Sequence, residues 1–121
     1  MVTKNTVLLG ASENPERYSY LATQKLVAHQ HPITAIGVKS GHIGTTPIIT
    51  THPAIADVDT VTLYLSPANQ KGYYDYILSL KPKRLIFNPG SENNELATLA
   101  KVNGIQPMEA CTLVLLSTGQ Y

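Results

Sequence analysis

Short aliphatic runs recur along this chain with longer amphipathic stretches between them, and this alternation most constrains its fold. The runs are Thr6–Leu9, Ile33–Val38, Val61–Leu65 and Arg84–Phe87, and such runs are typical of strands buried in a parallel sheet. Strands that alternate with helices of about a dozen residues imply right-handed βαβ units. The sequence therefore predicts an α/β fold, one doubly wound domain over residues 1–121. We expect a mostly parallel sheet of about five strands.

The stretch after the first strand predicts a helix over Tyr18–His29, because apolar residues recur there at spacings of three and four. That spacing places Leu21, Ala22 and Leu26 toward the sheet. Residues 112–117 fit a strand or a helix equally. The other expected elements are helices from Pro67 to about Leu80 and over Glu92–Val102 with Gly104 as its cap, a weaker strand over Ile105–Glu109, a short strand around Ile48–Ile49, and one turn of helix over Pro53–Val58.

The charge balance excludes a broad binding surface for nucleic acid or for an anionic membrane. Nine Lys and Arg are balanced by eight Asp and Glu, and neither sign forms a block. A single cysteine, Cys111, rules out an intrachain disulfide. The first apolar run, Val7–Leu9, is shorter than the ~7–15 residues of a secretory signal or the ~20 of a membrane span. We therefore expect a cytoplasmic protein.

Ligands of open parallel sheets bind outside the carboxyl ends of the strands, where the strand order reverses. Segments that are far apart in the sequence should therefore converge there. The candidate ligand-binding residues at these strand ends are Gly10, Ala11, Ser12, Val38, Lys39, Ser66, Pro67, Asn88, Pro89 and Gly90.

The turn after the first strand carries two groups suited to an anion. The Gly-x-Gly-x-x-Gly fingerprint of dinucleotide sites would place glycine at the positions of Ser12 and Pro15, so this turn suits a nicotinamide dinucleotide less well. Ser12 offers a hydroxyl, and Arg17 offers a guanidinium that can hold phosphate through two hydrogen bonds. Alternatively, Ser12 caps the next helix and Arg17 is a solvated surface charge.

Lys39 stands where an NAD site usually places an acidic residue for the ribose hydroxyl. A cation there favours a ligand with an additional phosphate near the adenosine, either coenzyme A or NADP. An ordinary exposed lysine is the alternative. In the turn after the Arg84 strand, Gly90 can bring the backbone close to a ligand and Ser91 can cap the next helix. A tight turn that needs glycine for its dihedral angles explains the same pattern.

Together these segments resemble the stand-alone CoA-binding domains, which are similar to the nucleotide-binding domain of the succinyl-CoA synthetase alpha subunit. The resemblance covers nearly the whole chain, and the segments that carry it are Val7–Ser12, Asn14–Arg17, Ile36–Lys39, Gly44, Asn88–Asn93 and Ala110–Thr112. It implies a three-layer Rossmann-like fold that holds the ADP part of coenzyme A or acyl-CoA. Lys39-Ser40 replace the Asn-Pro that many members carry after the second strand.

The resemblance also implies roles for individual residues. Phosphate would lie among Gly10, Ala11, Ser12 and Arg17, and Lys39 would lie near the 3′-phosphate or the adenosine. The other side of the ligand would meet Ser66, Pro67, Asn88, Pro89 and Gly90.

No catalytic constellation is evident, so the sequence predicts a binding module without catalytic activity of its own. His29 and His31 end the first helix, and His42 and His52 lie in a glycine-rich loop without the paired carboxylates or cysteines of a metal site, so we expect no metal. Cys111 fits either a thiol near the pantetheine arm of CoA or a buried small side chain. The alternative functions are a small NADP-binding oxidoreductase or its cofactor subunit, and an interaction protein that has lost its ligand. A homodimer or an unidentified protein partner is left open.

Overall fold

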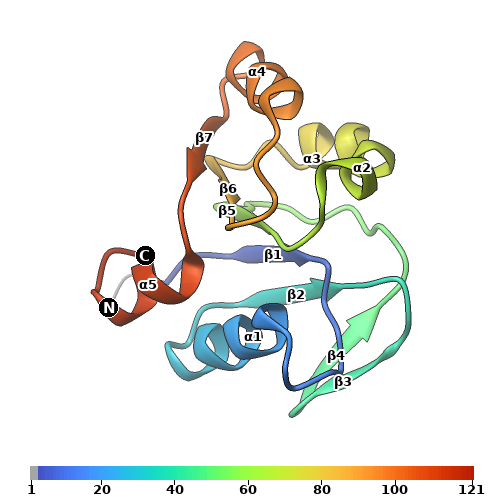
Figure 1. Ribbon diagram of the computed structural model, residues 1–121, viewed down its shortest axis with the longest axis vertical. Helices are drawn as coiled ribbons and strands as arrows, with labels where there is room; N and C mark the ends of the chain where they lie inside the picture. The colour runs from blue at the N-terminus through green and yellow to red at the C-terminus, as the bar shows by residue number, and fades with distance from the viewer. Residues whose placement is uncertain (1–2) are drawn as a thin grey trace.

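The computed structural model describes residues 3–121 and contains one sheet with strand order β3-β4-β2-β1-β5-β6-β7 (Figure 1). The strands are β1 (Thr6–Leu9), β2 (Ile33–Ile36), β3 (Gly41–Ile43), β4 (Thr46–Ile49), β5 (Thr60–Leu63), β6 (Arg84–Phe87) and β7 (Gln106–Glu109). All neighbouring pairs are parallel except β3 and β4, which form an antiparallel hairpin. The fold is therefore Rossmann-like α/β, as predicted.

The helices pack on both faces of this sheet, which gives three layers (Figure 1). They are α1 (Tyr18–Ala28), α2 (Pro67–Gln70), the 3₁₀ turn η1 (Lys71–Tyr73), α3 (Tyr74–Leu80), α4 (Asn94–Val102) and α5 (Thr112–Ser117). In β1, Val7 and Leu9 belong to the core with Ile77 of α3 and Leu96 of α4. Leu8 belongs to the opposite core, which includes residues of α1 and α5. Because strand side chains alternate between faces, both faces of each central strand must be apolar.

The sheet has seven strands, so the expected number of about five was too low. The difference comes from the β3–β4 hairpin, where the sequence indicated only a short strand around Ile48–Ile49. Gly41 and His42 have no strand pattern of their own, and pairing with Ile48 and Pro47 makes this segment β3. Gly44 turns the hairpin with φ +60°.

Three helical predictions also need correction. Leu21 of α1 is exposed, because Ser19, Ala22, Thr23 and Leu26 form the buried face. The expected helix from Pro67 to Leu80 is interrupted at η1, which contains the weak helix former Gly72. No helix forms over residues 53–58. There, the Asn5 side chain donates hydrogen bonds to the carbonyl oxygens of Ala56 and Asp57.

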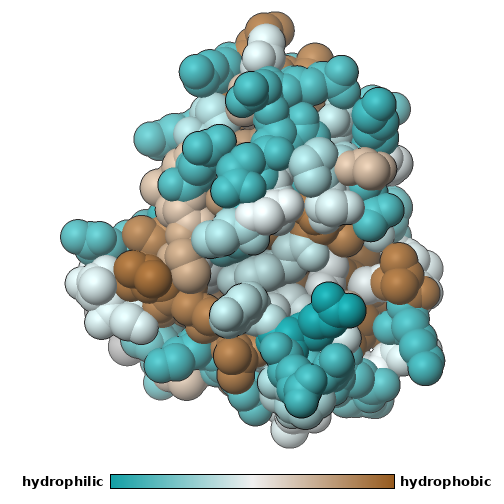
Figure 2. All heavy atoms as spheres, in the orientation of Figure 1, coloured by the Kyte–Doolittle hydropathy of each residue, from teal (hydrophilic) through white to brown (hydrophobic). Residues whose placement is uncertain are grey.

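The last segment, residues 112–117, is the helix α5, which decides between the two readings of the sequence. It packs beside α1, and apolar side chains gather over it in Figure 2. Val114 of this helix is exposed. Helix α4 begins after Asn93, whose side chain accepts a hydrogen bond from Leu96 N at 3.1 Å. Gly104, past the end of α4, has the expected positive φ of +75°. Between residues 3 and 121 no helix is long and apolar enough to cross a membrane.

Candidate functional site

A cleft of about 830 Å³ lies at the carboxyl ends of β1, β2, β5 and β6. The chain runs outward from β1 to β2 and then returns to place β5 on the other side of β1, so the strand order reverses here. Most of the predicted site residues line this cleft, namely Gly10, Ala11, Ser12, Arg17, Val38, Lys39, Ser66, Pro89 and Gly90. Pro67 and Asn88 are not among its lining residues.

The turn after β1 is fixed by backbone contacts with both neighbouring strands. Gly10 N and Ala11 N donate to Ile36 O at 2.9 and 3.0 Å, so these two amides are used within the fold. Gly10 has φ +99°, and a Cβ atom there would lie 2.5 Å from Tyr64 O. Only glycine fits this position, because any side chain would meet both the backbone strain and the contact.

The structure contradicts one of the expectations for this turn, the capping of the next helix by Ser12. Helix α1 begins only after Arg17, and Arg17 makes no side-chain cap hydrogen bond, so Ser12 does not cap the helix. Instead, Ser12 Oγ accepts a hydrogen bond from Asn14 N at 3.1 Å and closes a small turn. The Ser12 hydroxyl can still donate its own proton into the cleft.

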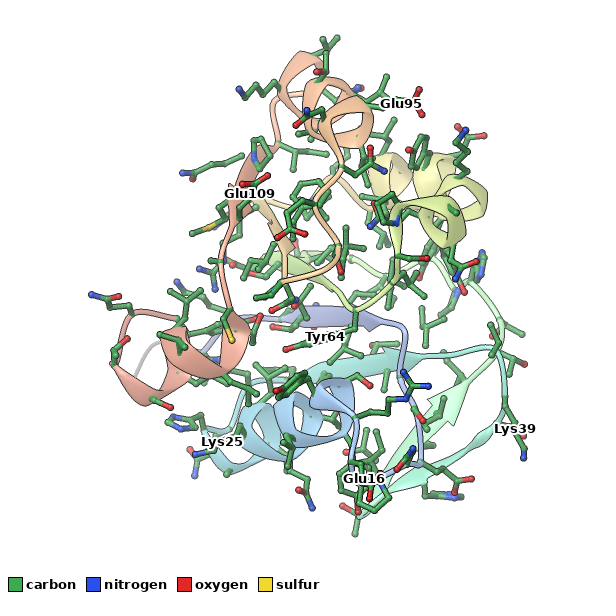
Figure 3. All side chains as sticks on the ribbon, viewed as in Figure 1. Glu16, Lys25, Lys39, Tyr64, Glu95 and Glu109 are labelled. Atoms are coloured by element: carbon green, nitrogen blue, oxygen red, sulfur yellow. The ribbon has the colours of Figure 1, made fainter. Side chains whose placement is uncertain are left out.

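The end of β2 is held tightly against the same turn. A Cβ atom on Gly37 would collide with Ala11 O, and Gly37 N donates to Ile49 O at 3.0 Å. Val38 and Lys39 then extend from this end, and Val38 is 89% exposed. Figure 3 shows Lys39 at the outer rim, well away from Tyr64.

The charged side chains of the cleft come from one side only. They are Glu13, Arg17 and Lys39, which lie on the β1–α1 and β2–β3 connections. Glu13 Oε2 accepts a hydrogen bond from His42 N at 3.0 Å, which ties its carboxylate to β3 at the rim. The lining residues after β5 and β6 carry no charged side chain. The cleft therefore has a charged half and an uncharged half.

The buried side chain of Gln70 links the two connections that form the uncharged half of the cleft through hydrogen bonds, a role that sequence analysis missed. The side chain is fully buried, and its Nε2 donates to Leu65 O at 2.8 Å and to Ser91 O at 2.7 Å. Its Oε1 accepts from Asn93 Nδ2 at 2.9 Å. These bonds join the connection after β5 to the connection after β6. The only signal in the sequence was a glutamine in the helix expected from Pro67 to about Leu80, which does not distinguish a buried residue from a surface one.

Asn88 is part of the internal structure and does not line the cleft, because its amide is 1% exposed and fully bonded. Its Nδ2 donates to Thr62 Oγ1 at 2.7 Å and to Leu63 O at 2.8 Å, and its Oδ1 accepts from Thr112 N at 2.8 Å. Ser91 does not cap α4 as expected, since its hydroxyl donates to Leu63 O at 3.1 Å. Pro67 occupies the first turn of α2.

Tyr64 was expected to lie within a strand over Val61–Leu65, but β5 ends at Leu63 and Tyr64 lines the cleft. Its hydroxyl is buried without a hydrogen-bond partner among the described residues. Burial raises the pKa of this phenol well above its usual value, and the nearby Cys111 adds to the rise. Cys111 itself is partly buried with a free thiol.

Within residues 3–121, no cluster of three or more His, Cys, Asp or Glu side chains could hold a metal ion.

Comparisons with solved structures agree with this architecture. A crystal structure of an uncharacterized protein is 50% identical, with a TM-score of 0.97 and full coverage of both chains. A hypothetical protein from Pyrococcus horikoshii OT3 is 20% identical with a TM-score of 0.81, covering 96% of this chain and 83% of that one. A Thermus thermophilus protein is 15% identical with a TM-score of 0.83, covering 98% and 91%. The last two likenesses show the fold alone.

A search of curated proteins found no match. The family model described as "CoA binding domain" matches residues 4–117, which is nearly the whole described chain and includes every element from β1 to α5. The chain therefore belongs to the CoA-binding domain family.

Proposed function

We propose that this protein is a binding module that holds coenzyme A or acyl-CoA in the cleft and has no catalytic activity of its own. The observation that carries the ligand class is the family membership over residues 4–117. The cleft supports the place of binding, since it lies at the carboxyl ends of parallel strands where the strand order reverses.

The two halves of the cleft suit the two parts of this ligand. Arg17 and Lys39 can attract the phosphates, and the Ser12 hydroxyl can donate to a phosphate oxygen. The uncharged half, between the connections after β5 and β6, suits the uncharged pantetheine arm. Val38 is available to cover the adenosine because its side chain is almost fully exposed.

The absence of catalysis is proposed from the chemistry of the lining. Within the described residues 3–121, none of the four histidines lines the cleft. The carboxylate of Glu13 is tied to His42 N at the rim. Among the described residues that line the cleft, no histidine stands beside a free carboxylate, which supports binding without acid–base catalysis by such a pair.

An NADP-binding subunit is the second candidate, because Lys39 would also suit the additional phosphate of NADP. The turn after β1 favours coenzyme A. Ser12 and Pro15 stand where the dinucleotide fingerprint requires glycine for close approach of the pyrophosphate.

Calorimetric titration separates these candidates. The ligands are CoA, 3′-dephospho-CoA, NADPH and NADH, and the variants are Lys39→Ala and the control Lys25→Ala on the exposed surface of α1. We expect CoA to bind most tightly and removal of the 3′-phosphate to weaken it. Lys39→Ala should weaken CoA about fivefold, because an exposed ion pair contributes about 1 kcal/mol. The same substitution should leave 3′-dephospho-CoA nearly unaffected.

Binding of NADPH without any response to CoA would replace this proposal with the NADP subunit. If none of the four ligands bound, the protein would be an interaction protein that keeps the fold without the ligand. Equal losses in Lys39→Ala and Lys25→Ala would remove Lys39 from the site and leave only a general effect of net charge.

A further inference from the structure

We propose that the Tyr64 hydroxyl recognises the uncharged pantetheine arm of the ligand by donating a hydrogen bond to one of its carbonyl oxygens. The inference rests on the proposed function and assigns a specificity-determining residue to the uncharged half of the cleft. Four features carry it: the fixed position of Tyr64, its unpartnered hydroxyl, its protonation and the distribution of charge around it.

The backbone of Tyr64 is fixed at the switch between β1 and β5. Tyr64 N donates to Leu9 O at 2.9 Å, and the close approach of Gly10 places the turn after β1 directly against Tyr64 O and Cβ. The side chain extends from this point toward the start of α5 (Figure 3) and packs on the core face shared by α1 and α5. The ring therefore has a defined place at the boundary between the cleft and α5.

The hydroxyl at the end of this ring has no hydrogen-bond partner among residues 3–121. The Thr112 hydroxyl lies near it and forms a 2.9 Å hydrogen bond with Thr62 Oγ1. Buried polar groups are almost always hydrogen-bonded, so an unpartnered hydroxyl beside a cleft points to a partner that arrives with a ligand. Tyr64 as a whole is partly exposed while its hydroxyl is covered, so the side chain must move for the hydroxyl to meet that partner.

The chemistry of the partner follows from charge and protonation. Burial holds the Tyr64 pKa far above neutrality, so the hydroxyl keeps its proton and can donate it in a hydrogen bond. The charged lining residues lie on the β1–α1 and β2–β3 connections, whereas the lining residues of the connections after β5 and β6 include no cation. An uncharged acceptor fits this half best, and the amide and thioester carbonyl oxygens of an acyl-CoA arm are such acceptors.

Calorimetry on wild type and Tyr64→Phe, with three probes, tests this assignment. The probes are 3′-phosphoadenosine 5′-diphosphate, which lacks the arm, CoA, which has amide carbonyls, and acetyl-CoA, which adds a thioester carbonyl. Tyr64→Phe should lower the affinity for the two probes that carry the arm by about tenfold, as expected for a lost buried hydrogen bond. It should not change the affinity for 3′-phosphoadenosine 5′-diphosphate.

The pattern of loss identifies the acceptor. Equal losses for CoA and acetyl-CoA assign an amide carbonyl, and a loss confined to acetyl-CoA assigns the thioester carbonyl. The matched control is Tyr20→Phe, which removes a hydroxyl from the same core face at a residue that does not line the cleft. It should leave all three affinities unchanged.

A second readout is independent of the ligand. Because the hydroxyl has no partner in the unliganded protein, Tyr64→Phe should leave its Tm unchanged or raise it. A clear loss of Tm, or unchanged affinities for CoA and acetyl-CoA while wild type binds both, would overturn the assignment and leave the proposed function standing. Wild-type protein that binds none of the probes would refute the proposed function, and this inference with it.

Discussion

Asn88 joins three elements through one buried amide, next to the cleft but not part of its lining. Its hydrogen bonds to Thr62, Leu63 and Thr112 connect β5, β6 and the start of α5. Because all three bonds are within the protein, the side chain has a structural role even though it follows a strand at the edge where ligands bind. Its removal should therefore be measured as a loss of stability.

Asn88→Ala should lower the free energy of unfolding by about 2–4 kcal/mol, since it removes three buried hydrogen bonds and leaves the buried Thr112 N without its acceptor. Urea unfolding followed by circular dichroism measures this loss. The control is Asn94→Ala, an exposed asparagine at the start of α4, which should change stability by less than about 0.5 kcal/mol. An Asn88→Ala protein as stable as wild type but unable to bind CoA would instead make Asn88 a ligand contact.

At the scale of elements, α5 and the segment after it pack with α1 on the same face of the sheet. Tyr121 is 8% exposed, and its hydroxyl shares a 2.6 Å hydrogen bond with Thr6 Oγ1 of β1. The Arg84 guanidinium lies 4.3 Å from the centre of the Tyr121 ring, and the His31 ring lies 4.9 Å from it. The residues after α5 are thus anchored at the edge of the sheet opposite the cleft.

Two variants of Tyr121 separate the contribution of its hydroxyl hydrogen bond from that of its ring packing. Tyr121→Phe should cost about 1 kcal/mol of unfolding free energy, because it removes one buried hydrogen bond. Tyr121→Ala should cost about 3–5 kcal/mol, because it also removes the ring from beneath Arg84. Thermal and urea unfolding provide the measurement, with the exposed Gln120→Ala as control. If Tyr121→Ala matched the control, the packing of this segment would contribute nothing to the fold.

The elements that could be predicted are those whose own side chains determine them. The strands β1, β2, β5 and β6 are aliphatic runs that are buried within a sheet. The apolar spacing in Glu92–Val102 predicted α4, although its cap is Asn93 and not the expected Ser91. The strand β3 could not be predicted, because pairing with β4 creates it. The break at η1 was not expected, although Gly72, a weak helix former, lies within it.

The candidate site could be predicted in position but not in detail. Strand ends identify the edge where Ser12, Lys39 and Gly90 converge, since parallel strands all end at the same edge of a sheet. Tyr64 and Gln70 were missed because their roles depend on which atoms surround them in the folded protein. The same dependence explains Asn88, whose partners on β5 and α5 are distant in sequence.

At the scale of the whole molecule, the three layers give the site its shape. Helices α3 and α4 cover one face of the sheet, α1 and α5 cover the other, and the strand order reverses between β1 and β5 (Figure 1). The cleft lies at the carboxyl edge of the strands between these layers, with its charged residues on one side. A second, smaller groove at the opposite edge, lined by Asn5, Asp57 and Lys81 among others, provides an internal comparison.

Amide NMR spectra of nitrogen-15-labelled protein during titration with CoA test the central claim most directly, because they report where the ligand binds. The account predicts that the largest shifts fall on the amides of Ser12, Lys39, Tyr64, Ser66 and Gly90, with those of Asn5, Asp57 and Lys81 unchanged. Shifts centred on the groove at the opposite edge, or no shifts at saturating CoA, would contradict it.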